Sequence, residues 1–208
     1  MEDVLDVYQR PYDPKRPQVC LDEASKQLLA DVREPLPMKP GQVERFDNEY
    51  VRGGTANLFM LFEPLAGKRH IEVTARRTGV DFAHVLKDLV DVHYPEAEVI
   101  VLVMDNLNTH TPASLYEAFA PVEAKRLADK FEIHYTPRHG SWLNMAEIEL
   151  SVLSRQCLSE RMSDKTRLVE QIAAWEFQRN ARSMRVNWRF TTADARIKLK
   201  RLYPTILP

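Results

Sequence analysis

Cysteine is scarce in this sequence. Only Cys20 and Cys157 occur among the 208 residues, and neither has a neighbouring cysteine or histidine at the spacing of a zinc site. We therefore expect two reduced, buried thiols, and we exclude a disulfide framework and a structural zinc centre.

Long apolar stretches are also missing. The longest uninterrupted run extends from Val99 to Met104, whereas a membrane-spanning helix needs about 20 apolar residues. The first residues, MEDVLDVYQR, carry no signal-peptide pattern. These absences predict a cytoplasmic protein that does not contact a membrane.

An excess of charge of either sign is absent as well, since the formal net charge is -1. The overall balance therefore gives no support to nucleic-acid binding. The C-terminal part differs, because its basic residues are opposed only by Asp194; they are Arg179, Arg182, Arg185, Arg189, Arg196, Lys198, Lys200 and Arg201. Such a tail suits a phosphate backbone, and it suits the solvated surface of terminal helices equally well.

The length and composition predict one folded domain with a small appendage. The chain is 44% hydrophobic and 28% charged, which is typical of globular proteins. Residues 1–17 contain Pro11, Pro14 and Pro17 and are predicted to form an extended lead-in. We place the core domain at 18–160 and a set of basic C-terminal helices at 161–208.

The hydrophobic pattern changes period along the core. Strands are predicted at 18–22, 48–51, 55–63, 69–75, 98–104 and 131–135, with no regular structure over 25–40. Helices are predicted from Val80, from Thr111, over 121–130, after Ser141, and after a cap at Ser163 or Asp164. This order predicts an α/β protein with a mixed sheet flanked by helices. The ribonuclease H-like fold has this order, and other three-layer folds share it.

Three acidic residues stand where a purely structural role is difficult to justify. Asp22 follows the first predicted strand, Asp105 follows the apolar run that ends at Met104, and Glu147 lies early in a helix. A carboxylate at the end of a buried strand needs a partner that neutralises it, and a divalent cation is one such partner. The structural alternatives are that Asp22 is an aspartate that begins a turn and that Glu147 is a solvated glutamate at the edge of a helix.

For two of these three positions, the sequence pattern alone does not decide which of two acidic residues would be the metal ligand. Glu23 is an alternative to Asp22 because the two are adjacent. Glu149 is an alternative to Glu147, because both flank the apolar stripe of a helix that turns by about 100° per residue.

Carboxylates from two strand ends and one helix suit magnesium, which prefers hard oxygen ligands. Two such ions roughly 3.5 to 4 Å apart can clamp the attacking and leaving oxygens of an in-line phosphoryl transfer. The pattern therefore favours an enzyme with a two-metal site for Mg²⁺ or Mn²⁺.

Three blocks of the sequence resemble the acidic blocks of IS630-family transposases, which are related to the Tc1/mariner group. The blocks are VCLDE at 19–23, LVMDNLNTH at 102–110 and YTPRHGSWLNMAEIEL at 135–150. The resemblance extends from Val19 to Trp175, which is most of the chain. It implies a ribonuclease H-like DDE catalytic domain.

The resemblance also implies a set of catalytic residues and a reaction. Asp22, Asp105 and Glu147 would be both the catalytic residues and the ligands of Mg²⁺ or Mn²⁺. The activity implied is that of a metal-dependent DNA endonuclease and strand transferase, which cuts double-stranded DNA at transposon ends. The released 3′-hydroxyl would then join target DNA, with a TA dinucleotide preferred, and a dimer is expected in the active complex.

Further candidates surround these three residues. Glu23, Asn106 and His110 are predicted to hold ligands or water beside the metals, although a capping or core role is equally open. Arg138, with the tail residues Arg182, Arg185 and Arg189, is predicted to contact DNA phosphates.

The N-terminal region departs from the resemblance. Only 21 residues precede Asp22, where full-length members of the family carry helix-turn-helix modules. A helix-turn-helix partner from a separate reading frame is one interpretation. The alternatives are an inactive, truncated remnant, or a ribonuclease H-like nuclease that acts on another substrate such as an RNA·DNA hybrid or a four-way junction.

Overall fold

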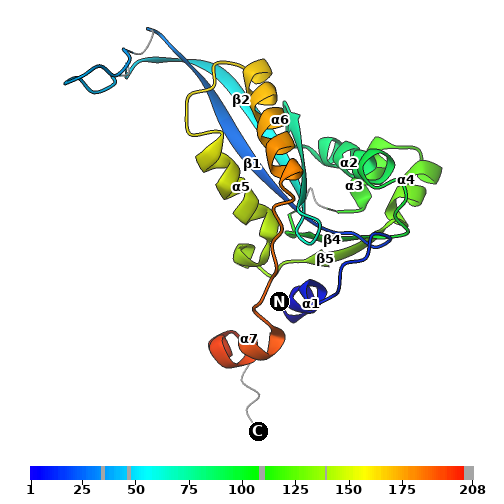
Figure 1. The fold of residues 1–208 in the computed structure, drawn as a ribbon. Coiled ribbons are helices and arrows are strands. Elements are labelled where there is room, and N and C mark those ends of the chain that lie inside the picture. Colours follow the sequence, from blue (N-terminus) through cyan, green and yellow to red (C-terminus); the bar gives the residue numbers. More distant parts are fainter. Residues whose placement is uncertain (34–35, 46–47, 108–110, 139, 204–208) are drawn as a thin grey trace.

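A five-stranded mixed sheet forms the centre of the molecule (Figure 1). The computed structural model describes residues 1–33, 36–45, 48–107, 111–138 and 140–203. The strand order is β3-β2-β1-β4-β5, in which β1 to β3 are antiparallel neighbours and β4 and β5 run parallel to β1. The strands are β1 (Gln18–Asp31), β2 (Tyr50–Glu63), β3 (Lys68–Thr74), β4 (Ile100–Met104) and β5 (Phe131–Tyr135). The predicted mixed α/β sheet is confirmed.

Helices cover both faces of the sheet because successive side chains of a buried strand point to opposite faces. Val19 and Leu21 of β1 pack in one core cluster, and Cys20 packs in the other. The first cluster includes the helices α2 (Gly79–Asp88), α3 (Ala113–Ala118) and α4 (Pro121–Ala128). The second cluster includes α5 (Met145–Gln156) and α6 (Lys165–Ala181). The same alternation decides which face each acidic residue occupies.

The predicted extended lead-in is wrong for its first half, because residues Glu2–Tyr8 form helix α1. Val4 and Leu5 are fully buried in the α5 side of the core. The side-chain amide of Gln18 donates to the carbonyl oxygen of Val7 at 2.6 Å, which fastens α1 to the start of β1. Acidic residues in the first turn favour this helix through its dipole, and the prolines at 11, 14 and 17 all follow it.

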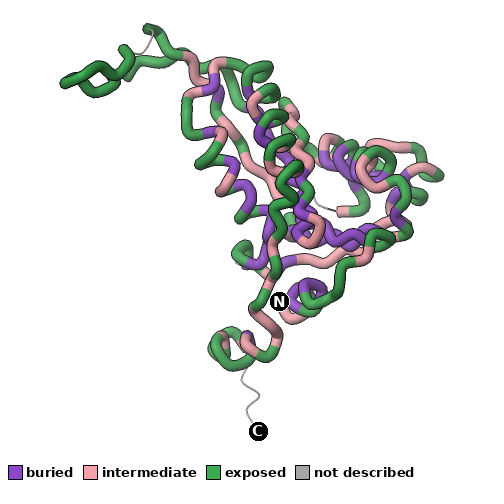
Figure 2. The backbone as a smooth tube through the Cα atoms, in the orientation of Figure 1, coloured by how far each residue is buried: buried purple, intermediate pink, exposed green. Residues whose placement is uncertain are grey.

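The first two strands are much longer than predicted. β1 continues from Asp22 to Asp31 and pairs with β2 as far as Tyr50, with one register irregularity between Leu28 and Leu29. Figures 1 and 2 show that the distal ends of this pair extend away from the body and are largely exposed. The predicted absence of regular structure from 25 onward is therefore incorrect up to Asp31.

The remaining elements lie close to their predicted positions. α2 continues into a π-helical turn at Leu89–His93, and the side chain of Asp164 caps α6 by accepting from the backbone N–H of Arg167 at 2.9 Å. The C-terminal region adds α7 (Thr192–Lys198) and a 3-10 turn at Lys200–Leu202. Both cysteines are free thiols, Cys20 buried and Cys157 partly buried. Among the described residues, none of the helices is long and apolar enough to cross a membrane.

Candidate active site

Asp22 and Asp105 lie at corresponding positions on two neighbouring parallel strands. The β1–β4 ladder pairs Cys20 with Val103, and each aspartate follows two residues later. Because side chains alternate, both aspartates continue the row of Cys20 and Val103, which belongs to the face covered by α5. Asp22 therefore lies inside β1 and not at its end as predicted, whereas Asp105 directly follows β4, and both carboxylates face the same helix.

Glu147 lies in the first turn of that helix, three residues after the N-cap residue Asn144. A cavity of about 410 Å³ is lined by Asp22, Asp105 and Glu147 together. Its other lining residues are Glu23, Ala24, Ser141, Asn144, Leu150, Ser151 and Ser154. Three acidic residues from separate parts of the sequence therefore meet at one opening.

Glu149 does not reach this cavity, because the helix turns it into the core. It is 2% exposed, and its Oε1 accepts from the Nε of Arg69 at 2.6 Å and forms an ion pair with the Nε of Arg179 at 2.7 Å. Arg69 is itself fully buried. The geometry thus separates the two glutamates that the sequence left open: Glu147 borders the acidic cavity, and Glu149 belongs to a buried ion cluster.

The environment of Asp22 disfavours the ionised form of its carboxyl group. Burial raises the pKa of Asp22 to about 6, and the negative charges of Asp105 and Glu147 act in the same direction. The backbone N–H of Glu23 donates to Asp22 Oδ1 at 2.8 Å and opposes this effect. A cation at the cavity would relieve the repulsion, so the charge and the hard oxygen donors fit a divalent metal.

The carboxylates are not preassembled as a tight ligand set. Over the part of the chain that is described, no group of three or more His, Cys, Asp or Glu side chains has an arrangement that could hold a metal ion. The three residues fit a divalent metal by their hard oxygen donors and by the cavity that they share.

The residues predicted to assist the metals divide between different environments. Glu23 borders the acidic cavity, but its carboxylate pairs with the Nε of Arg77 at 3.1 Å. Asn106 and Arg138 line an adjoining cavity of about 490 Å³ that also includes Asp105. His110 lies outside the described residues.

The two cavities are neighbours, because Asp105 and Ser141 line both of them. Arg138 brings a positive charge to one cavity, whereas Asp22 and Glu147 line the other. This polarity suits a phosphodiester chain whose reacting phosphate meets cations held by the carboxylates.

The predicted phosphate contacts in the tail are not brought to the groove. Arg182, Arg185 and Arg189 are exposed and line neither cavity. Two other basic residues of the tail form internal ion pairs, Arg179 with Glu149 and Arg196 with Glu2. The tail is accordingly less available to a partner than its composition indicated.

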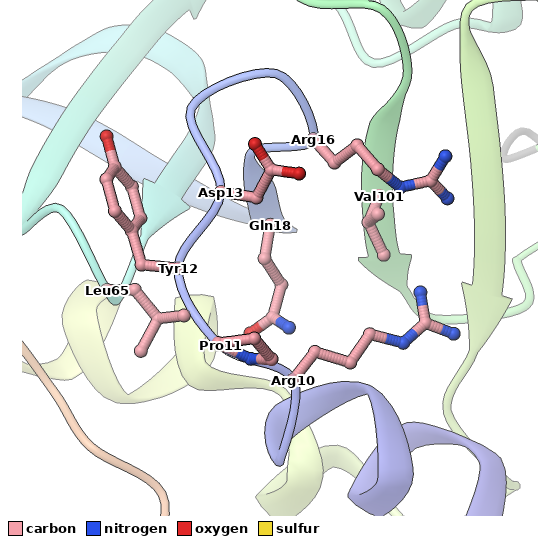
Figure 3. A pocket seen from close by; sticks show the side chains of 8 residues that line it. All are labelled: Arg10, Pro11, Tyr12, Asp13, Arg16, Gln18, Leu65 and Val101. Carbon is pink, nitrogen blue, oxygen red and sulfur yellow. The ribbon is translucent and has the colours of Figure 1, made fainter.

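Another cavity, of about 220 Å³, has a different chemical character (Figure 3). Arg10 and Arg16 line it, and Figure 3 shows both guanidinium groups extending past Val101 toward β5. Both form ion pairs with Glu132, the first at 2.6 Å between Nη1 and Oε1. Their charge is thus partly neutralised within the fold, and we assign no chemistry to this cavity.

Two residues that hold the site together were not identified from the sequence. Asn144 is 1% exposed; its Nδ2 donates to the carbonyl oxygen of Leu21 at 2.8 Å, and its Oδ1 accepts from the backbone N–H of Ala146 at 3.1 Å. The hydroxyl of Tyr8 donates to the carbonyl oxygen of Leu143 at 2.6 Å. An asparagine before a helix is an N-cap signal, but its bond to a distant strand has no local signature.

A mixed sheet that brings carboxylates from β1, from the residue after β4 and from the first turn of α5 to one cavity defines a nuclease-like domain of the ribonuclease H class. The chain belongs to the DDE superfamily endonuclease family, whose profile matches residues 17–169. No curated protein sequence shows a significant match.

Solved structures of a mariner transposase share the fold. The Mos1 mariner paired-end complex with Mn aligns with a TM-score of 0.57 at 14% identity, covering 87% of this chain and 55% of that one. The Mos1 strand transfer complex aligns with a TM-score of 0.58 at 15% identity, covering 87% and 54%. The chain spans about half the length of these proteins. The predicted ribonuclease H-like fold is thereby confirmed.

Proposed function

We propose that this chain is the catalytic domain of a transposase of the IS630 and Tc1/mariner type, which cuts double-stranded DNA and transfers the cut strand. The observation that carries the proposal is that Asp22, Asp105 and Glu147 line one cavity of about 410 Å³. Membership of the DDE endonuclease family supports a nuclease, and the fold shared with Mos1 supports a transposase.

Asp22 and Asp105 would share the metal ions, and Glu147 would complete the site from α5. When bound, two Mg²⁺ or Mn²⁺ ions supply the positive charge that stabilises the attacking and leaving oxygens of an in-line displacement. The carboxylates would hold that charge beside β1, β4 and α5, and the raised pKa of Asp22 reflects its burial and the neighbouring negative charges. The roles of these side chains are ligation and positioning, so no covalent protein intermediate is required.

The groove supplies a path for the DNA strand. Arg138 and Asn106 border the adjoining cavity of about 490 Å³, where Arg138 would bind a phosphate next to the reacting one. The substrates proposed are transposon ends and a TA-containing target. A dimer in the active complex and a helix-turn-helix partner from a separate reading frame belong to the same proposal, and the Mos1 structures described as paired-end and strand transfer complexes support the paired arrangement.

The first test is isothermal titration of Mn²⁺ into the wild type and two isosteric variants, Glu147→Gln and Asp105→Asn. Glu170→Gln is the matched control, because Glu170 is an exposed helix glutamate that lines neither cavity. We expect Mn²⁺ binding in the wild type and the control and its loss in both site variants. A folded wild type that binds no Mn²⁺ in excess would favour the inactive remnant.

The second test compares substrates with the same four proteins. Mn²⁺-dependent cutting of duplex DNA that carries transposon ends, with 3′-hydroxyl joining to a TA-containing plasmid, would support the transposase. Preferential cutting of an RNA·DNA hybrid or a four-way junction would instead identify another nuclease of this fold.

A further inference from the structure

Asn144 joins the two halves of the acidic site with one side chain. Its Nδ2 donates to the carbonyl oxygen of Leu21, the residue before Asp22, at 2.8 Å. Its Oδ1 accepts from the backbone N–H of Ala146, the residue before Glu147, at 3.1 Å. The amide group therefore connects β1 at Leu21 to the first turn of α5, immediately beside both carboxylates.

This connection crosses a long interval of sequence. Leu21 and Asn144 lie on separate elements, and α5 and β1 pack together in one core cluster. A directional hydrogen bond between buried groups fixes both distance and orientation, and its loss leaves the Leu21 carbonyl without that donor. The position of Glu147 relative to Asp22 thus depends on a group that belongs to neither residue.

A second bond supports the same turn from the other side. The hydroxyl of Tyr8, which is 4% exposed, donates to the carbonyl oxygen of Leu143 at 2.6 Å. Successive residues, Leu143 and Asn144, are therefore tied to α1 and to β1. The turn before Glu147 is held by two long-range hydrogen bonds in addition to its own helix cap.

We propose that Asn144 is a positioning residue that sets the separation of Asp22 and Glu147 and thereby sets the metal affinity of the site. This inference rests on the proposed function, because it gives Asn144 a role in a metal site. A helix cap alone would require only the bond to Ala146. The bond to Leu21 is the part that a cap does not explain.

Two variants separate positioning from capping. Asn144→Asp keeps the size and the N-cap acceptor but replaces the donor with an oxygen that faces the Leu21 carbonyl. Asn144→Ser also keeps a cap, adds no charge, and is too short to bridge to β1. Asp164→Ala is the control, since Asp164 caps α6 by accepting from the backbone N–H of Arg167, and it lines neither cavity.

The Mn²⁺ affinity and the thermal midpoint of each variant are then measured together. We expect both Asn144 variants to bind Mn²⁺ about 10- to 100-fold more weakly, which is the range for residues that orient metal ligands. The control should lower the thermal midpoint and leave Mn²⁺ affinity unchanged. Asn144 variants that bind Mn²⁺ like the wild type would overturn the proposal.

Hydrogen exchange without metal tests the connection by itself. Faster exchange over residues 145–150 in Asn144→Ser, with no such change in Asp164→Ala, supports a bridge that fixes α5 to β1. Unchanged exchange contradicts it. A wild type that binds no Mn²⁺ would refute the proposed function, whereas wild-type binding with unaffected Asn144 variants would refute only the positioning role.

Discussion

Helix α5 carries two glutamates that meet opposite environments. Glu149 lies in a buried cluster where Arg69 and Arg179 supply its counter-charge. Glu147 borders the acidic cavity, and among the described residues it forms no ion pair. Where the chain supplies the cation, the carboxylate stabilises the fold. Where the chain supplies further carboxylates, the proposed metal ions would supply the counter-charge.

The same comparison predicts opposite effects on stability. The buried cluster joins β3, α5 and α6, and Arg69 also donates to the carbonyl oxygens of Gly67 and Met184 at 2.6 Å each. Removing a charge from this buried cluster should lower the free energy of unfolding. Removing a charge from the acidic cavity should raise it.

The largest expected effect comes from Glu149→Gln, which leaves two arginines at the cluster without their anionic partner. We expect a loss of about 3–5 kcal/mol in the free energy of unfolding, because breaking a buried ion pair leaves an uncompensated charge. Urea denaturation followed by circular dichroism measures it. A loss no larger than that of the Glu170→Gln control would show that the cluster does not hold these elements together.

A smaller effect of opposite sign is expected from Asp22→Asn in metal-free buffer. Burial and neighbouring charges raise the pKa of Asp22 from 3.8 to about 6, so its ionisation costs the folded state free energy above that range. At pH 7 the variant should be more stable by up to about 2–3 kcal/mol, at 1.36 kcal/mol per pKa unit.

The pH dependence of this difference provides its control. Wild-type stability contributed by neutral Asp22 is present below pH 3.8 and is lost as the pH rises through about 6. The two proteins should therefore converge in unfolding free energy near pH 4. A constant difference between pH 4 and pH 7 would assign the effect to packing and not to charge.

The smallest effect is expected from Tyr8→Phe, which removes the hydroxyl bound to the Leu143 carbonyl. We expect a loss of about 1–2 kcal/mol, because a buried acceptor loses its donor. Nicking by this variant should fall while the Glu149 cluster stays intact. Full wild-type stability would show that α1 does not support the turn before Glu147.

The sequence predicted those helices and strands whose pattern lies within the element itself. Strand β4 is a continuous apolar run, so its position and the placement of Asp105 at its end followed from pattern alone. The choice of Glu147 came from the resemblance of the third block, since the helical period did not separate it from Glu149. The partners of Glu149 lie on β3 and α6, and nothing near Glu149 in the sequence indicates them.

The missed elements depend on contacts between distant segments. Helix α1 has only 7 residues, so its stability comes from burying Val4 and Leu5 and not from propensity. The outer half of β1 contains polar residues such as Lys26 and Gln27, and its pairing with β2 supplies the order. The hydrogen bond from Asn144 to Leu21 joins residues 123 positions apart, and no local pattern in the sequence indicates it.

Anomalous scattering from a crystal of the wild-type protein soaked in Mn²⁺ would locate the metal ions directly. We expect Mn²⁺ peaks bounded by Asp22, Asp105 and Glu147, and none at Glu149, with the peaks lost in Glu147→Gln crystals. A well-ordered cavity without anomalous density, or Mn²⁺ bound away from these three carboxylates, would contradict it.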